Sequence, residues 1–198
     1  MKFQVDLVDI GIGNIGSVKR CLERLGTGFR VVNANNFPDG ERPLILPGVG
    51  QFGAVMQALQ QNKFDCSLRD LILAGTPYLG ICIGLQILFE GSEESPNVSG
   101  LGLFKGQVVR FQAGKIPQIG WNLIAPVSEG IGKTGYAYFV NSYYAMPQIP
   151  SIISYKANYY GEFCAAVQSK NITAVQFHPE KSADFGSNFL KEWLQNVH

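Results

Sequence analysis

The chain has 198 residues, of which 46% are hydrophobic and 16% are charged, and its 16 Lys and Arg residues nearly balance its 15 Asp and Glu residues. This composition is typical of a globular protein and excludes a disordered chain. The even charge balance provides no basis for binding nucleic acid or an anionic membrane, and no apolar run reaches the roughly 18–20 residues of a membrane span. The N-terminal segment is typical of a first strand rather than a signal peptide. We therefore expect a single domain over residues 1–198, located in the cytoplasm.

The first half of the chain predicts alternating strands and helices. Apolar runs predict strands at residues 3–9, 29–34, 43–48 and 77–81. Helical spacing predicts helices at residues 16–26, 53–62, 67–75 and 84–91. This order of elements is typical of a parallel sheet with helices on both faces.

The second half of the chain is rich in predicted strands, with Gly, Asn and Pro between them. The strands are predicted at residues 107–112, 120–126, 136–146, 153–160, 163–169 and 172–177, and a final helix is predicted at 183–197. The fold class is therefore α/β, with a mixed, mostly parallel central sheet flanked by helices.

A glycine pattern follows the first strand. Gly11, Gly13 and Gly16 have the G-x-G-x-x-G spacing of a dinucleotide-binding turn. Such a site needs an acidic residue at the end of the second strand, but that strand ends in asparagines and the nearest acid, Asp39, lies in the following loop. We interpret the pattern as a tight turn and expect no nucleotide cofactor, with a nucleotide-binding module as the competing hypothesis.

The chain has four cysteines, and no two of them have the Cys-x-x-Cys spacing of a zinc site or a redox pair. We therefore expect no metal. Three of the four are predicted to be small buried side chains, namely Cys21, Cys66 and Cys164.

Cys82 lies in a different context, between a predicted strand and a predicted helix. The segment Gly80–Gly84 reads G-x-C-x-G, the pattern of a nucleophile elbow with a thiol as the nucleophile. Such an elbow exposes its side chain at the carboxyl end of the sheet, and the start of a helix favours the thiolate. The alternative is a cysteine of the core.

His178 is the candidate base for this thiol, since the only other histidine is the last residue of the chain. Pro179 turns the chain out of the preceding strand. Glu180 then accepts a hydrogen bond from one imidazole nitrogen and leaves the other to face Cys82. The alternatives are a structural histidine and a solvated surface acid.

Acyl transfer also needs donors for an oxyanion. The glycine-rich segment 46–52 follows the third strand and offers the backbone N–H groups of Val49 and Gly50. The N–H of Ile83, directly after the cysteine, is the expected second donor.

These residues resemble the class I, triad-type glutamine amidotransferase family. The resemblance rests on "GICIGLQ" (80–86) with "FHPE" (177–180), and it extends over the chain through "DIGIGNIGSV" (9–18), "LPGVGQF" (46–52), "KIPQIGWN" (115–122), "YFVNSY" (138–143) and "VQFHPEKS" (175–182). It implies a flavodoxin-like fold without a cofactor.

The resemblance also implies a chemistry. Cys82 attacks the side-chain amide of glutamine, His178 protonates the leaving ammonia and then activates water, and Glu180 orients His178. The family's contacts with glutamine carry over to Gly50, Gln86 and Ser142.

Within this family the motifs are most similar to glutaminase subunits that form a heterodimer with a cyclase subunit. That partner is a (β/α)₈ barrel, which uses the ammonia to make imidazole glycerol phosphate and an aminoimidazole carboxamide ribotide in histidine biosynthesis. Lys181 and Trp121 are then candidates for the partner interface. The alternatives are a solvated lysine and a core aromatic.

Two positions depart from the family's pattern. The family usually has histidines where this chain has Gln118 and Asn141, and neither amide titrates near pH 7. A paralogue that supplies ammonia to another synthase, such as one that amidates bacterial surface sugars, is therefore an alternative. A catalytically silent, partner-binding subunit is a further alternative.

Overall fold

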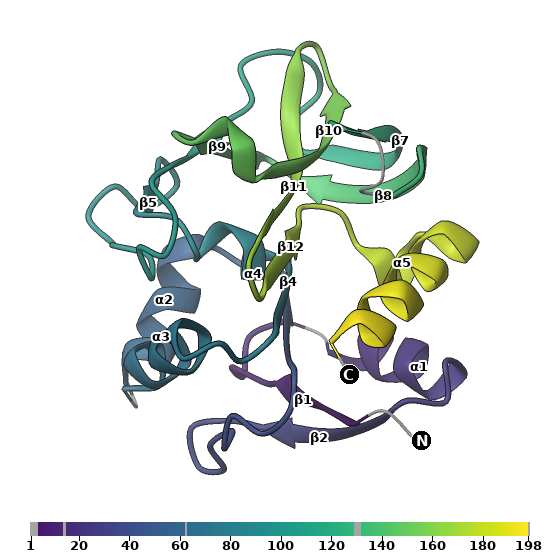
Figure 1. Ribbon diagram of the computed structural model, residues 1–198. Helices are drawn as coiled ribbons and strands as arrows, with labels where there is room; N and C mark the ends of the chain where they lie inside the picture. The colour runs from purple at the N-terminus through teal and green to yellow at the C-terminus, as the bar shows by residue number, and fades with distance from the viewer. Residues whose placement is uncertain (1–3, 14, 62, 129–131, 198) are drawn as a thin grey trace.

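The computed structural model describes residues 4–13, 15–61, 63–128 and 132–197. Nine strands of these residues form one sheet in the order β2-β1-β3-β4-β12-β11-β10-β7-β8 (Figure 1). The first five strands in this order are parallel to one another. They are β2 (Gly28–Val32), β1 (Gln4–Val8), β3 (Leu44–Gly48), β4 (Tyr78–Cys82) and β12 (Ile172–Val175). Their carboxyl ends lie along one edge of the sheet, where open α/β folds build their sites.

The other part of the sheet is antiparallel. It consists of β11 (Glu162–Ser169), β10 (Ile153–Asn158), β7 (Gln118–Pro126) and β8 (Gly135–Asn141), and β8 is the edge strand. The mixed sheet predicted from the sequence is thus present. The predicted positions 3 and 62, at the ends of one strand and one helix, lie outside the described residues.

Helices cover both faces of the parallel strands (Figure 1). α1 (Gly16–Arg24) and α5 (Ala183–Asn196) lie on one face, and α2 (Phe52–Gln61) and α3 (Phe64–Leu73) lie on the other. The helices cover the sheet because each has an apolar side. In α1 the buried residues Val18, Cys21 and Leu22 have i, i+3, i+4 spacing and form one apolar stripe that faces the core.

A second, three-stranded sheet contains β5 (Gly91–Ser92), β6 (Gly106–Arg110) and β9 (Tyr143–Pro147). The prediction of one strand over 136–146 was wrong, because β8 ends at Asn141 and β9 begins at Tyr143 in this other sheet. Ser142 lies at the change of sheet. An alternating pattern that continues through both strands cannot reveal such a change.

The predicted helix at 84–91 was also too long. α4 (Ile83–Gln86) has four residues, and the next apolar residues, Ile87 to Phe89, are fully buried. The chain turns here, and the carbonyl of Leu88 accepts hydrogen bonds from the backbone of Leu103 and Phe104 at 2.8 and 2.9 Å. Single 3₁₀ turns occur at Pro150–Ile152 (η1) and Pro179–Lys181 (η2).

Cys66 is exposed, so its predicted burial was wrong, whereas Cys21 and Cys164 are buried as expected. The reason is the face that α3 buries, which carries Phe64, Leu68 and Ile72. Position 66 lies about 200° around the helix from Phe64. In the described residues, no group of three or more His, Cys, Asp or Glu side chains is placed to hold a metal, and no helix is long and apolar enough to cross a membrane.

Candidate active site

Cys82 ends β4 in a strained turn. Its φ of +56° and ψ of −103° lie outside the regions that side-chain-bearing residues favour. A β-carbon at Gly80 would collide with the carbonyl of Gly84, and a β-carbon at Gly84 would collide with the carbonyl of Leu46. Both flanking glycines are therefore required, and the turn has the geometry of a nucleophile elbow.

Tyr78 holds this turn from within the core. Its side chain is fully buried, and its hydroxyl donates a hydrogen bond to the carbonyl oxygen of Gly84 at 2.8 Å. The bond joins the start of β4 to the first turn of α4. This role was not predictable from the sequence, because the pattern around Tyr78 indicates only a buried strand.

His178 and Glu180 form a buried pair at the end of β12. The Nδ1 atom of His178 lies 2.9 Å from Oε1 of Glu180, and the two side chains are 3% and 5% exposed. Pro179 begins the η2 turn that brings the carboxylate back to the ring. The interpretation of Glu180 as a solvated surface acid therefore does not hold.

The Cys82 sulfur raises the pKa of the His178 ring. Burial alone lowers the pKa of His178, but interactions with the Cys82 sulfur and with the Glu180 carboxylate outweigh burial and raise this pKa from 6.5 to about 10. Nε2 of the ring is buried and has no hydrogen-bond partner in the part of the chain that the structure describes, so it is the nitrogen left for the thiol. The Glu180 carboxylate therefore holds Nδ1, and the Cys82 sulfur lies close enough to the ring to influence its pKa.

Ser182 fixes His178 against β8. The Ser182 hydroxyl donates to the carbonyl of His178 at 2.7 Å and accepts from the backbone N–H of Tyr138 at 2.9 Å. The backbone N–H of His178 also donates to the Tyr138 carbonyl at 2.8 Å. Three hydrogen bonds therefore determine where the histidine lies relative to the sheet.

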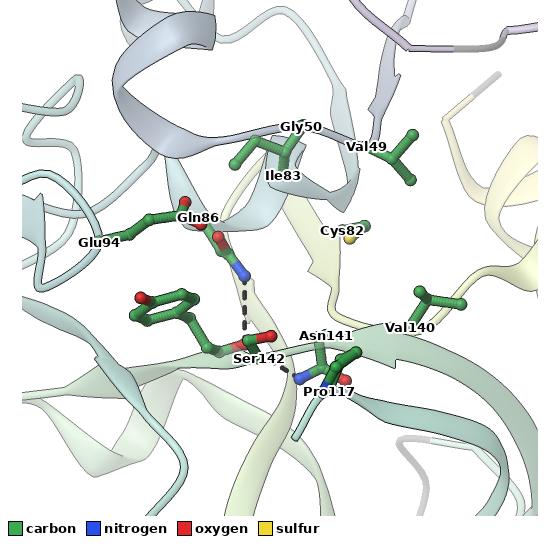
Figure 2. Close-up of a pocket in the computed structure, with 11 residues that line it drawn as sticks. Val49, Gly50, Cys82, Ile83, Gln86, Glu94, Pro117, Val140, Asn141 and Ser142 are labelled. Atoms are coloured by element: carbon green, nitrogen blue, oxygen red, sulfur yellow. Dashed lines mark hydrogen bonds between the residues drawn. The ribbon is translucent and has the colours of Figure 1, made fainter. Parts of the chain in front are cut away.

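A pocket of about 270 Å³ opens beside Cys82. Figure 2 shows the sulfur between the loop that carries Val49 and Gly50 and the segment that carries Asn141 and Ser142. The lining includes five of the residues predicted to form the oxyanion and substrate sites: Val49, Gly50, Ile83, Gln86 and Ser142. It also includes Glu94, Pro117, Val140, Asn141 and Tyr143.

The loop at Val49 and Gly50 continues β3, whose Gly48 is paired with Cys82 of β4. The N-terminal glycine turn packs against this loop. A β-carbon at Gly13, where φ is +88°, would lie 2.9 Å from the carbonyl oxygen of Val49 and 3.0 Å from its nitrogen. The glycine pattern near the N-terminus therefore permits a close approach to the loop beside Cys82.

A chain of buried amides connects the pocket with the sulfur. Nε2 of Gln86 donates to the Tyr143 carbonyl at 3.2 Å and to Oε1 of Gln176 at 3.1 Å. Nε2 of Gln176 donates in turn to Sγ of Cys82 at 3.6 Å. Sequence reasoning missed Gln176, although the residue lies two positions before His178.

Glu94 is a second residue that sequence reasoning missed. It lines the pocket, and its Oε2 accepts a hydrogen bond from the backbone N–H of Phe52, the first residue of α2, at 2.7 Å. Its carboxylate is the charged group of the pocket lining. Nothing in its local sequence distinguishes it from a loop acid.

A family model described as glutamine amidotransferase class-I matches residues 6–196. The chain belongs to the class-I glutamine amidotransferase family. The chain is 43% identical over 202 residues to imidazole glycerol phosphate synthase subunit HisH of Deinococcus radiodurans, with 96% of this chain and 94% of that protein covered. It is 43% identical over 200 residues to subunit HisH of Thermococcus kodakarensis, with 96% and 98% covered.

Solved structures share this fold. One described as a glutamine amidotransferase superposes with a TM-score of 0.79 at 20% identity and covers 98% of both chains. PurLQS from Thermotoga maritima superposes with a TM-score of 0.78 at 17% identity and covers 99% of both chains. At these identities the superpositions establish the fold.

The two residues of this amidotransferase predicted to contact a partner, Trp121 and Lys181, both lie next to Tyr138. The Trp121 and Tyr138 rings pack edge to face with centroids 6.0 Å apart, and Nζ of Lys181 lies 6.0 Å from the centre of the Tyr138 ring. Trp121 is 53% exposed, so the interpretation of a core aromatic does not hold.

Trp121 belongs to a larger exposed surface on the edge hairpin of β7 and β8. Directly opposite pairs on this surface are Ile119 with Val140, Trp121 with Tyr138 and Leu123 with Tyr136. We refer to these six side chains as the apolar face. It adjoins the pocket because Val140 lines both.

Proposed function

We propose that this chain is the glutaminase subunit of an imidazole glycerol phosphate synthase. It hydrolyses glutamine to glutamate and ammonia through Cys82, His178 and Glu180, and it passes the ammonia to a cyclase subunit in histidine biosynthesis. The observation that carries the proposal is the buried His178–Glu180 pair beside the strained Cys82 elbow. The similarity to HisH subunits over nearly the full chain supports the choice of synthase. We propose that residues 1–198 form one amidotransferase domain, which acts in the cytoplasm.

The first chemical step forms a thioester. The proton of the Cys82 thiol passes to His178, the sulfur attacks the side-chain amide carbon of glutamine, and the carbonyl oxygen becomes an oxyanion. The backbone N–H of Ile83 and an N–H of Val49 or Gly50 donate hydrogen bonds to that oxygen. His178 gives its proton to the amide nitrogen, the C–N bond breaks and ammonia leaves.

The second step releases glutamate. His178, now neutral, accepts a proton from water, whose oxygen attacks the thioester carbon. The C–S bond breaks and the sulfur returns to its starting state. Glu180 keeps Nδ1 of the ring occupied at 2.9 Å, so Nε2 faces the reacting atoms in both steps.

Glutamine binds in the pocket beside Cys82, with contacts from Gly50, Gln86 and Ser142. The hydrogen bonds of Gln86 support this assignment. Its nitrogen is engaged by Tyr143 and Gln176, and its oxygen, which accepts no hydrogen bond from the described residues, is the atom that can accept one from the substrate. The Glu94 carboxylate suits the positive α-amino group of an amino acid.

We propose that the synthase partner docks on the apolar face, next to Lys181. Two side chains of the apolar face, Ile119 and Tyr136, are 63% and 61% exposed. A contiguous exposed apolar surface is typical of protein interfaces. The proposed partner is a (β/α)₈ cyclase and the assembly a heterodimer. The names of the relatives, which are synthase subunits, support a partner.

A second candidate uses the same chemistry with a different partner. The amides at Gln118 and Asn141, where the family usually has histidines, favour a paralogue that supplies ammonia to another synthase, such as one that amidates surface sugars. Identification of the synthase that co-purifies with the chain separates the two candidates.

Covalent labelling tests the glutaminase function. 6-Diazo-5-oxo-norleucine, a glutamine-like electrophile, is expected to label Cys82 in the presence of the partner, and Cys82→Ala is expected to abolish glutamine hydrolysis while ammonia-dependent synthesis persists. Cys66→Ala, which changes an exposed cysteine on α3, is the matched control and should keep full activity. Absence of label on Cys82 contradicts the proposed function.

A further inference from the structure

Gln118 and Asn141 form one local unit. They are directly opposite each other at the ends of β7 and β8, so their side chains leave the same face of the hairpin with β-carbons about 5 Å apart. Both lie on the buried face, 4% and 5% exposed, opposite to the apolar face. The two positions that depart from the family's pattern are therefore neighbours in the structure.

Each amide has a buried carbonyl oxygen without a partner. Among the described residues, neither Oε1 of Gln118 nor Oδ1 of Asn141 accepts a hydrogen bond. Nδ2 of Asn141 donates to the carbonyl of Tyr143 at 3.0 Å, so the asparagine cannot turn its nitrogen toward Gln118 without losing that bond. Two buried acceptors on paired residues are unfavourable unless a molecule with N–H or O–H donors satisfies them.

The position of Asn141 indicates which molecule supplies the donors. Asn141 lines the pocket that contains Cys82, where the proposed reaction releases ammonia. Ammonia has three N–H donors, which suit two carbonyl acceptors. We propose that Gln118 and Asn141 hold the released ammonia through their carbonyl oxygens before it leaves the subunit. This inference rests on the proposed glutaminase function.

Amides suit this role chemically. Neither side chain has an acidic proton to give near pH 7, so the pair binds the N–H groups and leaves ammonia in its nucleophilic form. The pair also lies at the correct end of the hairpin, since the neighbouring residue Val140 belongs to the apolar face. Ammonia held here lies on the opposite side of the hairpin from the apolar face, at the strand end where Val140 lines both that face and the pocket.

Hydroxylamine, an ammonia analogue, tests the pair. In the presence of glutamine its nitrogen attacks the Cys82 thioester, the C–S bond breaks, the sulfur regains its proton, and γ-glutamyl hydroxamate forms instead of glutamate. The ratio of hydroxamate to glutamate reports how well the amine is held near the thioester, and it does not depend on how much thioester forms.

Nearly isosteric variants remove one acceptor each. Gln118→Met and Asn141→Leu are each expected to lower the hydroxamate-to-glutamate ratio by about two- to tenfold, which corresponds to one hydrogen bond of ordinary strength. Asn122→Leu is the matched control. It changes an amide of the same strand that donates to the Asn158 carbonyl instead, and it should keep the wild-type ratio. An unchanged ratio in both Gln118→Met and Asn141→Leu overturns the proposal.

A second measurement needs no turnover. The side-chain amide resonances of Gln118 and Asn141 are followed by NMR during titration with ammonium chloride at alkaline pH, where neutral ammonia is present, with sodium chloride as the reference salt. A saturable shift that appears only with the ammonia solution supports the pair, and identical responses to both salts overturn it. If wild-type protein with its partner forms neither glutamate nor hydroxamate, the proposed function fails, and this titration separately shows whether the pair binds ammonia.

Discussion

The side-chain amide of Gln176 donates a hydrogen bond to the sulfur of Cys82, 94 residues earlier in the chain, with N and S 3.6 Å apart. Gln176 is fully buried, and its oxygen accepts a hydrogen bond from Gln86. The amide is therefore held from both sides and cannot turn freely. Since Gln86 also lines the pocket, the contacts of the substrate site and the position of the nucleophile are connected through one side chain.

Loss of this donor should make the Cys82 sulfur less reactive. A hydrogen bond to a charged sulfur favours the thiolate, so Gln176→Leu is expected to slow alkylation of Cys82 by iodoacetamide by about tenfold. Labelling at Cys82 is measured by mass spectrometry at fixed pH. Gln168→Leu, an exposed glutamine on β11, is the matched control. Equal alkylation rates in wild type and Gln176→Leu would show that the hydrogen bond does not affect reactivity.

The His178 ring should titrate far above the usual range of histidine. Its pKa is raised from 6.5 to about 10 by the Cys82 sulfur and the Glu180 carboxylate, which overcome the effect of burial. Cys82→Ala removes the larger of these two influences, so the ring pKa is expected to fall in that variant. NMR titration of the ring protons measures both values, and Cys66→Ala should leave the pKa unchanged. A ring that titrates near 6.5 in wild type contradicts this prediction.

The same shift predicts how stability depends on pH. The folded chain favours the protonated ring, so the contribution of His178 to stability is complete below pH 6.5 and is lost as the pH rises toward 10. The free energy of unfolding, measured in denaturant between these pH values, should therefore fall more steeply in wild type than in His178→Gln, which lacks the titrating ring. If the free energy of unfolding changes with pH equally in both proteins, the prediction is contradicted.

The sequence predicted the elements that carry local signals. Gly80 and Gly84 around Cys82 predicted the elbow because steric exclusion at those positions is a property of the turn itself. The amphipathic spacing of Val18, Cys21 and Leu22 predicted α1 for a similar reason. In each case the pattern lies within one element, and its physical cause acts over a few residues.

Features that depend on tertiary contacts were not predictable. The end of α4 after Gln86 and the change of sheet at Ser142 follow from what the chain packs against, and apolar runs such as 87–89 are ambiguous. Gln176 directly follows β12, within the strand predicted at 172–177, and nothing in that pattern indicates its bond to Cys82. Glu94 was missed because its position over the pocket is fixed by the start of α2, 42 residues away.

Glu94 should determine how tightly glutamine binds. Its carboxylate lines the pocket and is expected to pair with the α-amino group of the substrate. Glu94→Gln keeps the acceptor for the Phe52 N–H and removes the charge, so it should raise KM for glutamine about tenfold or more with a smaller change in kcat. Glu93→Gln, at the neighbouring position outside this pocket, is the matched control for the loss of charge. A change in kcat at constant KM would contradict a role in binding.

The surface around Tyr138 should carry the affinity for the synthase. Trp121 is half exposed and packs against Tyr138, and an exposed tryptophan at the centre of an apolar surface is typical of an interface hot spot. Trp121→Ala is expected to weaken the complex by about 30-fold, and Lys181→Ala by about tenfold or less, since its charge lies at the rim beside the same ring. Binding to the co-purified synthase is measured by calorimetry, and thermal unfolding of the free subunit should change little. Tyr160→Ala, which removes an aromatic ring 74% exposed outside the apolar face, is the matched control. If the affinities of Trp121→Ala and Lys181→Ala equal that of wild type, the synthase docks elsewhere on the subunit.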